Sequence, residues 1–203
     1  MDLRLEQDLH KAYEMMDSKW AIQNEKGDQE TRFIYKAQTL EDVIDKATIL
    51  GVDVNYALHR WYNYQTSIYC EHIFCDYGAV HEKDIYDHDK DIYINNIPFD
   101  VKLTVYPSIL SFHPFDLNTR TGKDAMIQWF YNSQSKGKRK QTVNRLYVVC
   151  DGENPLKMKS DFDKIRPQIK QYMDVYSSAP INTVYIYDNE RICTVQSDII
   201  LVS

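Results

Sequence analysis

The sequence has few glycines and no long apolar run, and both shortages exclude classes of protein. Six of its 203 residues are glycine, and GxGxxG, GxSxG and HExxH do not occur, which argues against P-loop, dinucleotide-binding and serine-hydrolase sites. No apolar run approaches about 18 residues, and the charged start MDLRLEQDLHKAYEMM is unlike a signal peptide. We therefore expect a cytoplasmic protein without a membrane span.

Cysteine is also scarce, and its spacing argues against a structural role. The four cysteines form no CxxC pair and are too few for a disulfide scaffold, so buried thiols in a reducing compartment are expected. Cysteine and histidine do cluster between residues 70 and 88. Cys70 and Cys75, however, fall on nearly opposite flanks of a predicted helix, and this disfavours a shared zinc ion. The residues of this cluster are Cys70, His72, Cys75, His81 and His88.

A net charge of −6 argues against attraction of nucleic acid by the whole surface, but it does not exclude one basic groove. Basic residues concentrate at 136–140, which reads KGKRK. Lys138, Arg139 and Lys140 are therefore candidate contacts to a phosphate backbone, with a solvated loop as the open alternative.

The periodicity predicts an α/β chain with a mixed central sheet flanked by helices. A helix between two strands implies a crossover, so that 145–150 should run parallel to 97–105. We expect one domain over residues 1–203, with an N-terminal helical extension at 1–52, a core at 53–151 and a C-terminal helix and strands at 152–203. Helices are predicted at 3–18, 39–51, 53–77, 123–134 and from Ser160 onwards, and strands at 90–95, 97–105, 145–150, 182–188 and 191–201.

The stretch DKDIYINNIPFDVKLT, residues 89–104, places charges in a hairpin otherwise suited to a core. If Asn95 and Asn96 form a two-residue turn, Asp91 lies opposite Asp100 and Asp89 lies opposite Lys102. Two carboxylates at that separation either repel each other or share a cation.

Two close carboxylates and a lysine meet the needs of metal-assisted phosphodiester cleavage. Carboxylate oxygens hold Mg²⁺, which polarises the phosphate and lowers the pKa of an attacking water. A lysine ammonium can orient that water or stabilise the charge that builds on the phosphorane. The alternative is a solvated strand face with a cross-strand ion pair.

This arrangement, Asp91 followed by Asp100-Val101-Lys102 on a hairpin, resembles the signature of the PD-(D/E)XK nuclease superfamily, with Lys90 in place of the proline that gives the motif its first letter. The resemblance covers residues 55–150 and implies a restriction-endonuclease-like core of helix, three strands, helix and strand. It also implies that Asp91, Asp100 and the Val101 carbonyl hold the metal and that Lys102 positions the water.

The same family often adds a glutamate from the helix before the sheet, and Glu71 is the candidate. It interrupts an apolar helical stripe, where an unpaired carboxylate would be costly unless a metal or lysine lies nearby. The alternative is that Glu71 lies at the edge of the stripe and reaches water. Glu82 is the second choice. The stripe consists of Ala57, Trp61, Tyr64, Ile68, Glu71 and Cys75.

These observations predict a Mg²⁺-dependent nuclease, with Mn²⁺ as a substitute metal and DNA as the favoured substrate. Asp91, Asp100, Lys102 and Glu71 would be its catalytic residues. Two alternatives stay open: a non-catalytic nucleic-acid-binding or assembly subunit with a nuclease-like fold, and an unrelated α/β protein with a salt-bridged hairpin. The sequence does not decide between a monomer and a homodimer.

Overall fold

A computed structural model describes residues 3–17, 23–84, 89–110, 114–133, 143–176, 183–188 and 191–203. Contacts between residues divide the chain into two units, Met1–Tyr69 and Cys70–Ser203. The division lies inside the long helix α4 (Val54–Asp76). Within the described residues, no helix is both long and apolar enough to cross a membrane.

The first unit is helical, and its sequence explains where two of its helices begin. Thr39 and Asp42 form a capping box at the start of α3, which ends at Gly51 with a positive φ of 65°. Asp53 accepts the backbone N–H groups of Asn55 and Tyr56 and so caps α4. The unit contains α1 (Leu3–Met15), α2 (Glu25–Glu30), η1 (Arg32–Tyr35), α3 (Leu40–Leu50) and the first part of α4.

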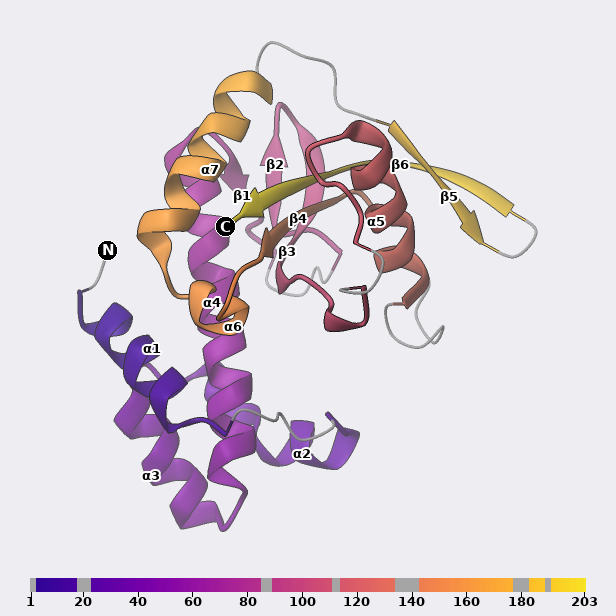
Figure 1. Ribbon diagram of the computed structural model, residues 1–203. Coiled ribbons are helices and arrows are strands. Elements are labelled where there is room, and N and C mark those ends of the chain that lie inside the picture. The colour runs from indigo at the N-terminus through magenta and orange to yellow at the C-terminus, as the bar shows by residue number, and fades with distance from the viewer. Residues whose placement is uncertain are drawn as a thin grey trace. The chain divides into compact units, whose positions relative to one another are not determined.

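The second unit is built around a mixed sheet, which confirms the predicted α/β class. Its described strands follow the order β1-β2-β3-β4-β6-β5 (Figure 1). β3 and β4 are parallel, as the crossover predicted, and β4 and β6 are also parallel. The strands are β1 (Val80–His81), β2 (Ile92–Ile94), β3 (Ile97–Val105), β4 (Arg145–Cys150), β5 (Thr183–Asp188) and β6 (Arg191–Val202), and the helices are η2 (Ser108–Leu110), α5 (Arg120–Ser133), α6 (Pro155–Met158) and α7 (Phe162–Tyr176).

The β2–β3 hairpin has the predicted turn. Asn95 and Asn96 take positive φ values of 51° and 64°, as a two-residue hairpin turn requires. Ile92 pairs with Phe99 in the ladder, which is the expected register. The apolar face of the hairpin is buried, and the Phe99 ring meets Tyr176 of α7 edge to face at 6.3 Å.

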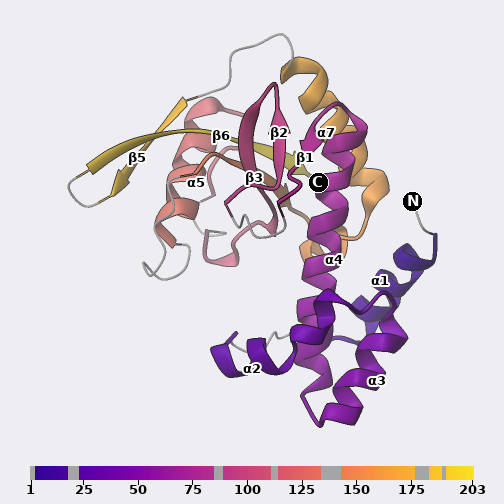
Figure 2. The same cartoon turned by 180° about the vertical axis from the view of Figure 1, so that it is seen from behind.

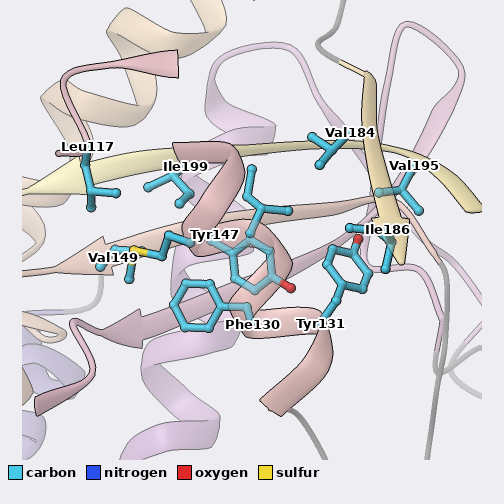
Figure 3. Packing of buried hydrophobic residues seen from close by; sticks show 11 residues of the cluster. Leu117, Phe130, Tyr131, Tyr147, Val149, Val184, Ile186, Val195 and Ile199 are labelled. Atoms are coloured by element: carbon cyan, nitrogen blue, oxygen red, sulfur yellow. The ribbon is translucent and has the colours of Figure 1, made fainter. Parts of the chain in front are cut away.

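Helices cover both faces of the sheet. The helix α5 packs on β5 and β6, and α7 packs on the opposite face of β6 (Figures 1 and 2). Under α5, the Phe130 ring stacks on Tyr147 with centroids 4.5 Å apart (Figure 3). The parallel ladder between β3 and β4 holds β3 beside this packed core and therefore fixes the position of the residues that β3 presents.

The start of α7 differs from the prediction. Ser160 was expected to begin this helix, but its hydroxyl donates to the Lys157 carbonyl of the preceding turn. Asp161 accepts the Lys164 N–H instead, and α7 begins at Phe162. The short helix α6 ends just before this point, and the Ser160 hydroxyl bonds to a carbonyl of α6 instead of capping α7.

Candidate functional site

Asp100 lies in β3 and is buried between two basic side chains. Its residue surface is 3% exposed. Oδ2 accepts from Arg145 Nε at 2.8 Å, and Oδ1 forms an ion pair with the Lys102 ammonium. Arg145 is the parallel partner of Asp100 on β4, and its guanidinium lies 5.0 Å from the Tyr131 ring centroid. The alternative of a solvated strand face is therefore wrong at Asp100.

Asp91 reaches the site in a way that the ladder alone did not predict. The β2–β3 pairing ends at Ile92, and the Asp91 N–H donates to the Phe99 carbonyl at 2.9 Å. This bond is one residue out of step with the ladder, so Asp91 does not simply continue the register opposite Asp100. Its carboxylate turns to β3 instead, where Oδ2 accepts the Val101 N–H at 2.7 Å.

The ionised form of Asp91 is disfavoured at this position. Burial and then the neighbouring charge of Asp100 raise the pKa of Asp91 from 3.8 to about 6, against the opposing effects of the Val101 N–H and the Lys102 ammonium. The two carboxylates are thus close, as predicted. The Val101 carbonyl points to the same side as the Val101 N–H, toward Asp91, because both groups of one strand residue face the same neighbour.

Glu71 joins these two residues from the last turns of α4. It is 6% exposed, so the alternative that it reaches water from the edge of the stripe is wrong. Burial and then the charge of Asp91 raise the pKa of Glu71 from 4.5 to about 7, although His81 and Lys102 act in the opposite direction. Glu71 and Asp91 therefore belong to one electrostatic cluster.

Lys102 is a basic residue that contacts this cluster and is also accessible to solvent. Its side chain is 42% exposed while it pairs with the buried Asp100. Its charge also lowers the pKa of Asp91 and of Glu71. A lysine so placed can neutralise the carboxylates, or it can donate to a ligand that approaches from solvent.

The donor set fits a hard divalent cation in its chemistry. The buried Glu71 and Asp100 and the half-buried Asp91 supply carboxylate oxygens. The pKa values of Glu71 and Asp91 are raised, and a cation would relieve the repulsion between these acids. As arranged, however, no group of three or more His, Cys, Asp or Glu within the described residues is disposed to hold a metal ion. Lys102 occupies Asp100 Oδ1 and the Val101 amide occupies Asp91 Oδ2. A cation would therefore have to compete with Lys102.

The other predicted residues do not join the cluster. Glu82 accepts the backbone N–H groups of Lys83 and Asp84 and the Tyr93 hydroxyl, so its carboxylate serves the loop after β1. Lys138, Arg139 and Lys140 lie outside the described residues. His88 of the cysteine and histidine cluster also lies outside them, and the described members of that cluster form no metal-binding group.

Two residues that touch the cluster were not predicted. The sequence places Arg145 at the start of the predicted buried strand 145–150 and close behind the basic KGKRK segment, and a charge at the first position of such a strand is the available signal. Its contact with Asp100 follows from the parallel register, which the sequence does not give. His81 hydrogen-bonds Glu71 across 3.1 Å between Nε2 and Oε2. No pattern in the sequence indicated that contact.

Comparison with known proteins gave no match. None of the family models, curated proteins or solved structures compared with this chain matches it. We therefore infer the function from the residues of the cluster and from their geometry.

Proposed function

We propose that the Cys70–Ser203 unit is a Mg²⁺-dependent nuclease of the PD-(D/E)XK type, which hydrolyses phosphodiester bonds of nucleic acid, with DNA favoured. The proposal rests on one observation above the others. Glu71 and Asp100 are buried, Asp91 is half-buried, and the three carboxylates form a cluster beside Lys102. Removing carboxylates from water is costly, and a bound cation would offset that cost, most of all at Glu71 and Asp91, whose pKa values are raised.

The order of elements supports the same proposal. Helix α4 is followed by β1, β2, β3, the crossover helix α5 and β4, which is the order that the resemblance implies. Asp91 lies immediately before β2, and Asp100 and Lys102 lie on β3. A restriction-endonuclease-like core is therefore part of the proposal.

The roles of the residues follow from their positions. Asp91, Asp100, the Val101 carbonyl and Glu71 would hold Mg²⁺ or Mn²⁺. When bound, the ion lowers the pKa of a water and polarises the phosphate. Lys102 donates from the solvent side to the attacking water or to a phosphate oxygen, where it stabilises negative charge that develops in the transition state. Arg145 keeps Asp100 Oδ2 engaged, so Oδ1 is the oxygen that can exchange partners.

A non-catalytic nucleic-acid-binding or assembly subunit is the second candidate, and one observation favours it. Both oxygens of Asp100 are satisfied by Lys102 and Arg145. A chain that has lost catalysis could keep such an ion triad as a structural element of the sheet.

Lys102→Ala separates the two candidates. Removing one preorganised electrostatic group lowers catalysis by about two to three orders of magnitude, so the variant should bind nucleic acid normally and cleave it far more slowly. Cleavage is measured with Mg²⁺ and with Mn²⁺ on single- and double-stranded DNA and RNA. Lys90→Ala is the matched control, because Lys90 pairs with Glu82 outside the cluster, and it should cleave like the wild type.

The outcomes have distinct meanings. A wild-type protein that binds nucleic acid but cuts none of these substrates favours the non-catalytic subunit. A Lys102→Ala variant that cleaves at the wild-type rate would contradict the role of Lys102 while leaving a nuclease.

A further inference from the structure

His81 lies behind the Glu71 carboxylate and is held from its other side. Its Nε2 is 3.1 Å from Glu71 Oε2, and its Nδ1 is 2.7 Å from the Glu82 carbonyl oxygen. Both ring nitrogens are therefore engaged, one by the cluster and one by the backbone of the residue that follows β1. The ring is fixed in its plane, although the side chain is 43% exposed.

The backbone contact determines which nitrogen carries the proton. A carbonyl oxygen only accepts, so Nδ1 must be the donor to Glu82. Nε2 is then directed at Glu71 Oε2, and one proton lies between these two atoms. Oε2 is thereby committed to His81, and Oε1 is the oxygen of Glu71 that remains for another partner.

We propose that His81 is a positioning residue of the site, which holds Glu71 by Oε2 and leaves Oε1 available to a cation that would bind together with Asp91 and Asp100. This inference rests on the proposed function. Residues that orient metal-binding side chains from behind typically change metal affinity by about 10- to 100-fold when they are replaced. The chemistry recognised is that of a hard divalent cation.

Two substitutions of similar size test the direction of the contact. In His81→Gln the side-chain amide can occupy the place of Nε2 and still reach Glu71. In His81→Asn the amide corresponds to Nδ1, so it can keep the bond to the Glu82 carbonyl but cannot reach Glu71. Mn²⁺ affinity by isothermal titration calorimetry should fall by about tenfold or more for His81→Asn, and His81→Gln should keep most of it.

His72→Ala is the matched control. The His72 ring lies 5.6 Å from the His81 ring, centroid to centroid, and it is exposed on the same helix as Glu71. A general disturbance of the structure around these two rings would lower Mn²⁺ affinity in His72→Ala as well as in His81→Asn. Loss of the proposed contact lowers it only in His81→Asn. His72→Ala should therefore bind Mn²⁺ like the wild type.

A second measurement excludes a purely structural role. Steady-state cleavage by His81→Asn at saturating Mn²⁺ should show a lower kcat with KM for DNA unchanged, because Glu71 is displaced while the surface that contacts DNA is intact. Equal Mn²⁺ affinity for wild type, His81→Asn and His81→Gln would overturn the inference and leave the nuclease standing. A wild-type protein that binds no Mn²⁺ would overturn both.

Discussion

Replacing Glu71 by glutamine should raise the free energy of unfolding at pH 8 in the absence of divalent metal. Glu71 is 6% exposed, and burial together with the charge of Asp91 raises the pKa of its carboxyl from 4.5 to about 7. The folded protein therefore holds a proton that the unfolded chain has already released between these two values. In that interval the free energy of unfolding of the wild type falls as the pH rises.

The magnitude follows from the same two pKa values. A rise from 4.5 to about 7 corresponds to a cost on the order of 3 kcal/mol once the pH exceeds the folded value. Below pH 4.5 the carboxyl is protonated in both states and the cost vanishes. Glutamine is neutral throughout, so Glu71→Gln should gain about 3 kcal/mol at pH 8 and about 1 kcal/mol or less at pH 5.

Urea unfolding of both proteins at pH 5 and pH 8, with a chelator present, measures this difference. Glu82→Gln is the control with the opposite sign, because hydrogen bonds from Tyr93 and from two backbone N–H groups lower the pKa of Glu82. That variant should gain nothing at pH 8. If Glu71→Gln is no more stable than the wild type at pH 8, the carboxylate cluster does not destabilise the fold, and a cation is not needed to offset its charge.

Three further predictions concern the cation, the buried arginine and the basic residues at 138–140. Asp100→Asn should bind Mn²⁺ at least about tenfold more weakly than the wild type by titration calorimetry, a loss of about 1.4 kcal/mol; equal affinity would exclude the site. Arg145→Ala should cost about 3–5 kcal/mol in urea unfolding because it leaves a buried Asp100 without its partner, whereas Arg166→Ala, from the more exposed pair with Asp76, should cost about 1 kcal/mol or less. Alanine at 138–140 should weaken DNA binding and flatten its salt dependence; an unchanged salt dependence would mean that these residues do not contact DNA.

The β2–β3 hairpin shows which structural features can be predicted from the sequence. Two adjacent asparagines and strict alternation determined the turn and the register from Ile92 to Phe99, because both signals are local. The position of Asp91 was harder to predict. Its carboxylate takes the Val101 N–H where the ladder ends, and the end of a ladder depends on what packs around it.

The environment of Asp100 depended on contacts that are distant in sequence. Arg145 is 45 residues away and becomes its neighbour only through the parallel pairing of β3 and β4. Periodicity predicted both strands but not which residues lie side by side. The short helices α2 and η1 were missed for a different reason: their sequences, EKGDQE and RFIY, are too short to show a helical period.

The ion pair between Lys102 and Asp100 links metal binding to catalysis. Lys102 occupies Asp100 Oδ1, the oxygen that Arg145 leaves available, so the ammonium and a cation compete for one ligand. Replacing Lys102 by alanine removes the group that competes with the cation for Asp100 Oδ1. It also removes a positive charge that repels the cation. Both effects act in the same direction, so Lys102→Ala should bind Mn²⁺ at least as tightly as the wild type while it cleaves more slowly. A loss of Mn²⁺ affinity in Lys102→Ala would mean that the lysine organises the carboxylates, and the ion triad would then be a structural element, as the non-catalytic alternative requires.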